Sequence, residues 1–223
     1  MYCKYKIKKM KTINIEEHID NLIEIRDKIQ LNEVTILTGD NATGKSVIRK
    51  TLWQHVNDLL GVEEQKSFVS EISMERRTGL HPGLGGGGVF LRDCGWTPTS
   101  METYRFIKGI FQILDDDNKK ISKRFIVLDE PEIGASKEVQ KAFAKYINNF
   151  YEKIHDNNKC YGLLVITHSD EIIKNLKCDN FLNIQGLTKE EYLNREIKDI
   201  DLEEIDNFSL ELFRGIRDRD KTK

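Results

Sequence analysis

The hydrophobic pattern of the chain alternates between short apolar runs and longer amphipathic stretches. The apolar runs are rich in β-branched residues, as expected of strands buried on both faces, and they cover residues 34–38, 125–128, 163–166 and 181–184. The amphipathic stretches repeat their apolar positions at helical spacing and cover Ile15–Ile29, 45–60, Lys137–Ile154 and Glu171–Leu176. Strands that alternate with helices along a chain predict an α/β fold with a mostly parallel sheet flanked by helices.

The other segments carry weaker patterns. We expect a strand near Tyr5–Ile13, another over Ser67–Met74, and a helix over Ser100–Leu114 with Ser100 as its N-cap. The stretch Thr78–Cys94 contains the run Gly85–Gly88 and indicates either a mobile loop or a segment ordered by a ligand or a partner. No linker divides the chain. We therefore expect one domain over 1–223, with a short helical and loop insertion at about 61–121 and a C-terminal helical tail at about 187–223. The alternating charges of 214–221 predict that this tail ends in a frayed segment.

Composition limits the class of protein. Of the 223 residues, 39% are hydrophobic and 32% are charged, and no apolar run approaches the roughly 20 residues that span a bilayer. Five lysines lie within Met1–Lys11, but no apolar segment follows them, so we expect no secretory signal and a cytoplasmic protein. The four cysteines have no paired spacing and are expected to be reduced thiols. The net charge of −2 gives no overall field that attracts nucleic acid, and the lysine-rich start is either a local phosphate-contacting arm or the solvated face of an edge strand.

The first motif with chemistry is the segment from Gly39 to Ser46, which fits the phosphate-binding pattern G-x-x-x-x-G-K-[ST]. It follows a predicted strand and precedes a predicted helix, which is the context that this motif requires. Glycines let successive backbone N–H groups turn toward one anion, and the helix N-terminus adds partial positive charge. Lys45 is expected to reach the β- and γ-phosphates, and the Ser46 hydroxyl is expected to bind Mg²⁺. The residues expected to contact the nucleotide here are Gly39, Asn41, Ala42, Thr43, Gly44, Lys45, Ser46 and Val47.

Two further strands end in polar residues. Asp129 and Glu130 follow the apolar run 125–128, and at the carboxyl edge of a parallel sheet they would lie where α/β proteins bind ligands. We expect Asp129 to bind Mg²⁺ with Ser46, and Glu130 to orient and deprotonate the attacking water. Thr167 and His168 follow the run 163–166, and His168 is expected to hydrogen-bond the γ-phosphate.

The order of these motifs resembles the ATP-binding cassette (ABC) ATPase family over about 34–60 and 122–186. The family's four apolar residues followed by Asp-Glu-Pro match 125–131, and its switch histidine matches His168. The resemblance implies Mg-ATP as ligand, the family's roles for Lys45, Ser46, Asp129, Glu130 and His168, and a homodimer with ATP between two facing copies. The family's signature Ser-Gly-Gly segment is replaced by 97–102, where Ser100 stands at a predicted helix start and could contact a γ-phosphate across the dimer.

Other family positions also differ. Gln65 and Glu75 are alternatives for the family's glutamine, Ser136 stands where the dimer-contacting aspartate is expected, and Tyr2 and Tyr5 are weak candidates for an adenine-stacking aromatic. We expect a soluble ABC-type ATPase of the non-transporter branch, which includes ATPases of chromosome maintenance, recombination and DNA repair, acting with an unknown protein partner. Two alternatives remain open: a regulatory switch with little turnover, and the ATPase subunit of a membrane transporter. The choice between ATP and GTP also stays open.

Overall fold

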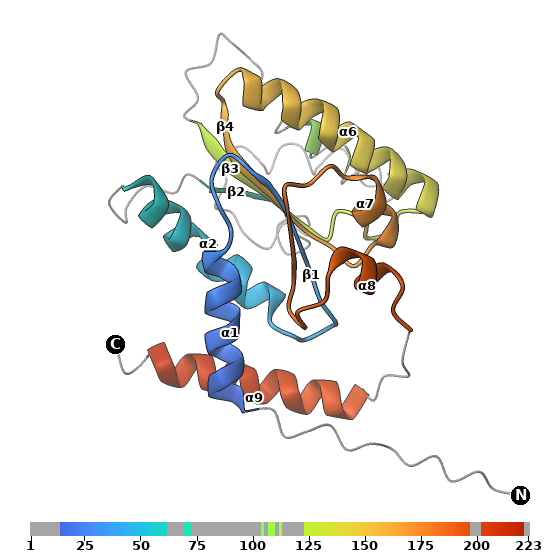
Figure 1. Ribbon diagram of the computed structural model, residues 1–223. Helices are drawn as coiled ribbons and strands as arrows, with labels where there is room; N and C mark the ends of the chain where they lie inside the picture. Colours follow the sequence, from blue (N-terminus) through green and yellow to red (C-terminus); the bar gives the residue numbers. More distant parts are fainter. Residues whose placement is uncertain are drawn as a thin grey trace, which may run out of the picture.

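The computed structural model describes residues 14–61, 69–72, 104, 107–109, 112, 123–196 and 202–220 of the chain (Figure 1). The described strands form a five-stranded sheet in the order β2–β3–β4–β1–β5, and every pairing in it is parallel. The strands are β1 Val34–Thr38, β2 Val69–Ile72, β3 Arg124–Asp129, β4 Cys160–Ile166 and β5 Asn180–Asn183. The predicted α/β fold with a parallel sheet and flanking helices is confirmed.

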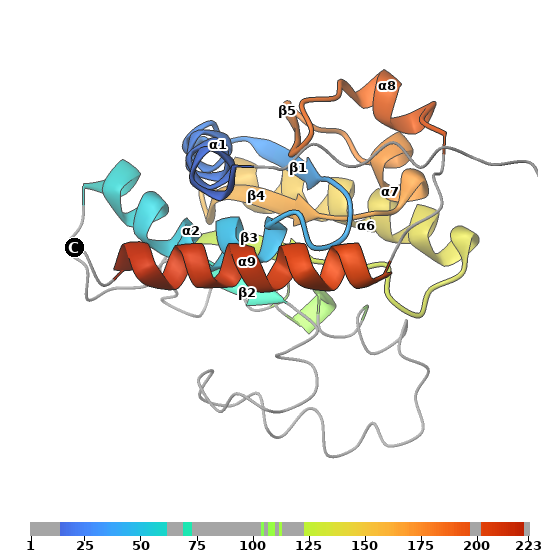
Figure 2. The ribbon, with the colours of Figure 1, turned by 90° about the horizontal axis from the view of Figure 1, so that it is seen from below.

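Helices cover both faces of this sheet (Figures 1 and 2). The described helices are α1 Ile15–Asp27, α2 Lys45–Leu60, α6 Lys137–Asp156, α7 Asp170–Asn175, α8 Lys189–Leu193 and α9 Leu202–Asp220. Apolar residues of α1, α2 and α9 pack on one face with Leu37, Val127 and Leu164. Apolar residues of α6, α7 and α8 pack on the other face with Ile36 and Ile126. Successive strand residues therefore enter two different cores, which explains why these strands lack a polar alternation.

The predicted element boundaries agree closely with those of the structure. The helix predicted over Ile15–Ile29 ends at Asp27, and the strand predicted over Ser67–Met74 is β2. Within the helix predicted over Ser100–Leu114, residues 104, 107–109 and 112 are described and are helical. The strand expected near Tyr5–Ile13 and the glycine-rich stretch Thr78–Cys94 lie outside the described residues.

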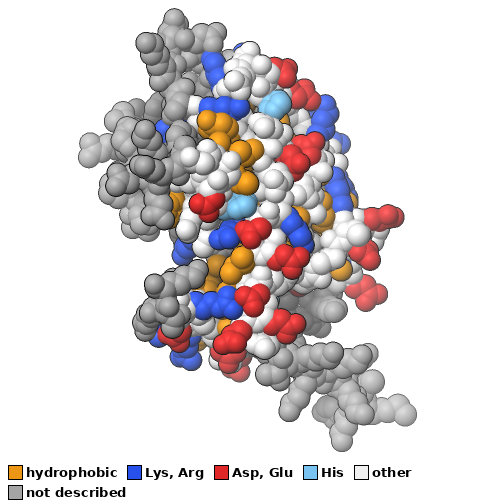
Figure 3. Space-filling model, turned by 60° about the vertical axis from the view of Figure 1, so that its left-hand side comes forward, with side chains coloured by type: hydrophobic (Ala, Val, Ile, Leu, Met, Phe, Trp, Pro, Cys, Tyr) orange, Lys and Arg blue, Asp and Glu red, His pale blue; other side chains and the backbone are white. Residues whose placement is uncertain are grey.

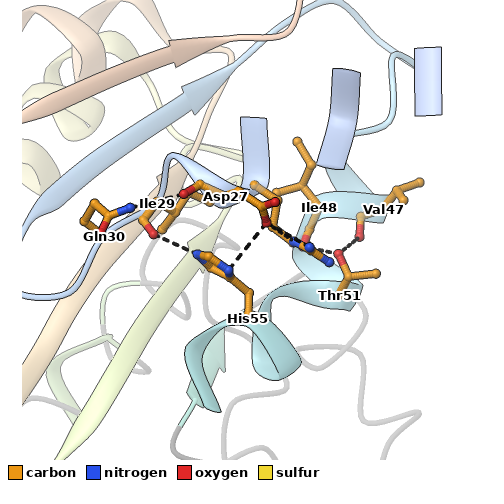
Figure 4. Close-up of polar contacts among 8 residues, drawn as sticks. Asp27, Ile29, Gln30, Val47, Ile48, Thr51 and His55 are labelled. Atoms are coloured by element: carbon orange, nitrogen blue, oxygen red, sulfur yellow. Dashed lines mark hydrogen bonds and ion pairs between the residues drawn. The ribbon is translucent and has the colours of Figure 1, made fainter. Parts of the chain in front are cut away.

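Polar contacts fix α1 against α2 (Figure 4). The buried His55 side chain of α2 contacts the carbonyl oxygen of Ile29 through Nε2 at 2.9 Å, and its Nδ1 lies 3.5 Å from Asp27 Oδ1. On the same helix, the Thr51 hydroxyl donates to the carbonyl of Val47 at 3.1 Å. The end of α1 is thereby held beside α2, which follows the segment predicted to bind phosphate, Gly39–Ser46, called the phosphate loop below.

The prediction of a frayed C-terminal segment over 214–221 is wrong for residues up to Asp220, because α9 continues to that residue. The alternating charges obscured an apolar stripe at helical spacing, formed by Ile205, Phe208, Leu212 and Ile216. Leu212 is buried in the core that α1 also enters. Gly215 lies so close to α1 that a Cβ atom there would meet Ile15 Cγ2 at 2.7 Å. Packing against α1, with an ion pair of 2.9 Å between Arg219 and Asp20, holds the segment helical.

Two observations concern the cysteines and the membrane. Cys160 is a buried free thiol and Cys178 a half-buried one, whereas Cys3 and Cys94 lie outside the described residues. In the described part of the chain, no helix combines the length and the apolar character needed to cross a membrane.

Candidate functional site

The segment between β1 and α2 forms a tight loop around the amino group of Lys45. β1 is fully buried and delivers the chain to Gly39, and α2 begins at Lys45 with Gly44 as its N-cap. Lys45 is buried, and its Nζ donates to the carbonyl oxygens of Gly39 at 3.0 Å and Asp40 at 2.6 Å. The Thr43 hydroxyl donates to the same Asp40 carbonyl at 2.8 Å. The loop therefore closes on the Lys45 amino group at the N-terminus of α2, and a helix N-terminus favours the binding of an anion.

Helix α1 supports this loop from outside, and the sequence did not indicate that role. Gly44 has a φ of 107°, and a Cβ atom there would lie 2.5 Å from Leu22 Cδ1 of α1. His18 Nε2 of α1 contacts the carbonyl oxygen of Thr43 at 2.8 Å. Any side chain at position 44 would therefore displace the Leu22 side chain from its place against the loop. The glycine is required both by its backbone conformation and by this close approach.

The ends of β3 and β4 bring the second and third motifs to the same edge. The order β3–β4–β1 places β4 between the strand that carries Asp129 and the strand that leads into the phosphate loop. The Glu130 backbone N–H donates to the Ile166 carbonyl at 2.8 Å, and that of Thr167 donates to the Leu37 carbonyl at 3.1 Å. His168 Nε2 lies 3.6 Å from Glu130 Oε1. The three turns that follow these strands are thus in register at one edge of the sheet.

Two residues at this edge have an unusual backbone conformation. Ala42 and Glu130 have φ values of 61° and 49°; the other non-glycine residues with positive φ in the described chain are Asn32 and Asn158. Asparagine tolerates the left-handed region, whereas alanine and glutamate are strained there by about 1–2 kcal/mol each. Strain of this kind clusters where the surrounding structure imposes a particular geometry, as at binding sites. Here Ala42 lies in the turn that leads into α2, and Glu130 follows β3, where its N–H bond to the Ile166 carbonyl holds the backbone.

The electrostatics of the edge differ from those of surface charges. Burial lowers the pKa of Lys45 to about 8, although the negative charges of Glu130, Asp40, Asp129 and Glu132 oppose this shift. Burial raises the pKa of Asp129 to about 6, against the stabilising charge of Arg49. Burial also raises the pKa of Glu132, whose Oε1 accepts from the His168 backbone N–H at 2.7 Å. A buried cation faced by several acids is the environment expected of a site that binds a charged ligand.

His168 is held as a neutral imidazole. Burial lowers its pKa to about 4, and the nearby positive charges of Lys45 and Arg195 lower it further. The Arg195 guanidinium lies 3.6 Å from the centre of the Tyr192 ring and 3.2 Å from Asp170 Oδ1, so its position is fixed. A neutral imidazole can still donate one hydrogen bond, so its suitability for a phosphate oxygen does not depend on protonation.

The shifted pKa of His168 gives the first prediction. In NMR spectra of the protein with labelled histidine, the His168 imidazole shifts should stay constant from pH 8 to pH 5.5 and move only near pH 4, because the charged form is disfavoured by burial. The spectrum of the His168→Gln variant assigns the signal. A titration midpoint near the ordinary value of 6.5 would show that the ring is solvated and that burial does not disfavour its charged form.

The predicted residues of the phosphate loop all lie in it, with different exposure. Gly39, Gly44 and Lys45 are buried, Ala42, Thr43 and Val47 are half-buried, and Asn41 and Ser46 are exposed. Asp129, Glu130 and His168 lie at the adjoining strand ends, as expected. Ser100 lies outside the described residues, as do Tyr2, Tyr5, Gln65 and Glu75, and Ser136 is the N-cap of α6.

Arg49 is a site residue that sequence reasoning missed. Its Nη1 lies 2.8 Å from Glu71 Oε1 and 3.1 Å from Asp129 Oδ2. The signal was present in the periodicity of α2, because Lys45, Arg49, Leu52 and Val56 share one buried face at spacings of three and four. A charged residue in that row indicates a buried partner, but the sequence alone does not identify which acid it meets.

The parallel sheet with helices on both faces defines the class of this protein as α/β, and the loop around Lys45 beside the aligned strand ends is consistent with a P-loop NTPase-like fold. No protein-family model matches the chain, and no curated protein matches its sequence. Among solved structures, the chain is similar to C. elegans PCH-2, with a TM-score of 0.34 and 16% identity over 76% of this chain and 40% of that one. It is also similar to Saccharomyces cerevisiae RIF2, with a TM-score of 0.39 and 12% identity over 92% of this chain and 76% of that one. The chain spans less than half the length of the PCH-2 chain, and similarity at this level assigns it to neither protein's family.

Proposed function

We propose that this chain is a magnesium-dependent ATPase of the ABC type. The observation that carries the proposal is the convergence of three turns around one buried cation, Lys45. The amino group already lies inside the loop, on the carbonyls of Gly39 and Asp40. The carboxylates of Asp129 and Glu130 lie close enough to act on its pKa. A helix N-terminus, one lysine and two acids fit a triphosphate with its metal ion.

Each residue has a distinct role in this proposal. Lys45 and the first N–H groups of α2 bind the β- and γ-phosphates, and Ser46 with Asp129 would hold Mg²⁺. The metal ion would neutralise charge on the phosphate oxygens during transfer. Glu130 accepts the proton of the water that attacks the γ-phosphorus as the bond between the β- and γ-phosphates breaks. His168, neutral at physiological pH, donates a hydrogen bond to a γ-phosphate oxygen.

The partner assignments rest on the resemblance and on surface charge. We propose that two copies associate when ATP is bound, with Ser100 reaching the γ-phosphate of the facing copy. A nucleic-acid partner has little support from charge, because lysine and arginine are interspersed with aspartate and glutamate over the face in Figure 3. The described residues of this chain carry no feature that identifies the protein partner on which the ATP cycle would act.

Two measurements on the purified chain test the proposed function. The chain should release phosphate from ATP only when Mg²⁺ is present, at a rate of order 0.01–10 s⁻¹ that lies at the low end of enzyme turnover. Light scattering of the Glu130→Gln protein should give the mass of a dimer with Mg-ATP and of a monomer with Mg-ADP. Tight Mg-ATP binding without turnover would favour the regulatory switch, and absence of nucleotide binding would refute the proposal.

A further inference from the structure

Arg49 connects the proposed magnesium ligand to a strand outside the three motifs. It lies one helical turn after Lys45 on α2, and its side chain is only 5% exposed. One nitrogen, Nη1, serves two carboxylates: Glu71 Oε1 at 2.8 Å and Asp129 Oδ2 at 3.1 Å. Both carboxylates are mostly buried, at 18% side-chain exposure. Charges so poorly solvated interact strongly with one another.

The sheet register explains why these two acids meet at one arginine. Glu71 of β2 pairs with Val127 of β3, and Asp129 is two residues further along the same strand. Residues two apart on a strand point to the same face. That face is the one packed against α2, since Val127 belongs to the core that Leu52 of α2 enters. The register between β2 and β3 therefore makes Glu71 and Asp129 neighbours, and Arg49 reaches them from α2.

We propose that Glu71 determines how strongly the positive charge of Arg49 opposes a magnesium ion at Asp129. The Arg49 guanidinium lies 3.1 Å from one oxygen of Asp129, Oδ2, and is therefore close to any metal ion that this carboxylate binds. Arg49 repels that ion, and Glu71 offsets the repulsion because it shares the same nitrogen. This inference rests on the proposed function, and it makes the magnesium affinity of the site depend on β2.

Charge arithmetic gives a sharp expectation. Arg49, Glu71 and Asp129 together carry a charge of −1 when all are ionised. The Glu71→Gln variant brings this sum to 0 while it keeps the size of the side chain. The double variant Arg49→Gln, Glu71→Gln restores the sum of −1. A loss of Mg²⁺ affinity caused by the charge of Arg49 should therefore be reversed in it. A loss caused only by damaged packing would grow larger in the double variant.

The test is a Mg²⁺ titration of ATP binding, followed with a fluorescent ATP analogue and referenced to analogue binding in excess EDTA. In Glu71→Gln the Mg²⁺ concentration at half-maximal effect should rise by about fivefold to tenfold, as expected for one nearby charge at partial burial. Binding in EDTA should change by less than about twofold. The double variant should return to within about twofold of the wild type. Glu71→Asp, which keeps the charge, should shift the midpoint by less than about twofold.

Glu152→Gln provides the control for net charge, because Glu152 lies on α6 with a side chain that is 56% exposed and pairs with Lys177. It should leave the Mg²⁺ midpoint unchanged. The inference is overturned if Glu71→Gln titrates like the wild type, or if the double variant is weaker than the single one. If Glu71→Gln does not fold, a tenfold rise of the Mg²⁺ midpoint in a folded double variant also overturns the inference. If the wild type binds no nucleotide at all, the proposed function has failed instead.

Discussion

Glu130→Gln is expected to reduce ATP turnover by about 100-fold to 10,000-fold, the contribution typical of a positioned general base. Mg-ATP affinity should change by less than about threefold, because glutamine has the same shape and Lys45, Ser46 and Asp129 are untouched. The backbone at this position already has a φ of 49°, so the replacement adds no new strain. Phosphate release at saturating ATP measures turnover, and calorimetry measures the affinity.

The matched control for this loss is Glu138→Gln, which removes a fully exposed carboxylate eight residues further along the chain. That variant should keep wild-type turnover, because the Glu138 carboxylate is fully exposed in the first turn of α6. Undiminished turnover in Glu130→Gln would remove Glu130 from the role of base. His168 or a water chain would then have to accept the proton. Equal losses in both variants would mean that net charge, and not the position of the carboxylate, controls the rate.

The parts of the fold that sequence predicted share one physical property: each was encoded by neighbouring residues. A buried parallel strand is a local apolar run, and a phosphate loop is a local pattern of glycine, lysine and serine. The carboxyl ends of parallel strands meet at one edge, so the motifs at Gly39, Asp129 and Thr167 could be placed together before any coordinates. The structure confirms the parallel sheet and aligns these strand ends.

The parts that sequence missed depend on residues far apart in the chain. The contact of Leu22 with Gly44 joins α1 to the phosphate loop, and Arg219 pairs with Asp20 across almost the whole chain. The partners of Arg49 follow from the register between β2 and β3, which no local pattern specifies. Near the C-terminus, the alternating charges predicted a frayed segment. The apolar stripe of that segment stabilises a helix because it packs against α1, which is far away in the sequence.

The strained conformations could not be predicted for a different reason. A local pattern favours glycine where φ is positive, yet Ala42 and Glu130 stand at such positions. Their conformation is imposed by surrounding contacts, such as the hydrogen bond from the Glu130 N–H to the Ile166 carbonyl. At Glu130 the residue type and the conformation of the backbone conflict. This is the pattern expected where function and local preference compete.

Lys45→Ala is expected to weaken Mg-ATP binding by about 100-fold or more, because hydrogen bonds to charged groups contribute about 1.5–3 kcal/mol each and Lys45 would make at least one to each terminal phosphate. The fold should survive. Burial has lowered the pKa of this amine to about 8, so its charge is costly without a ligand and its loss costs little stability. Thermal melting tests both points: ATP at 100 times the wild-type Kd should stabilise the wild type by about 2.7 kcal/mol and the variant by about 0.4 kcal/mol or less, since that concentration does not exceed the Kd of the variant. Lys50→Ala, which removes an exposed lysine from the same helix, should retain the wild-type shift. An equal ATP-induced shift in Lys45→Ala would show that the phosphates bind elsewhere, and the roles assigned to Ser46 and Asp129 would fail with it.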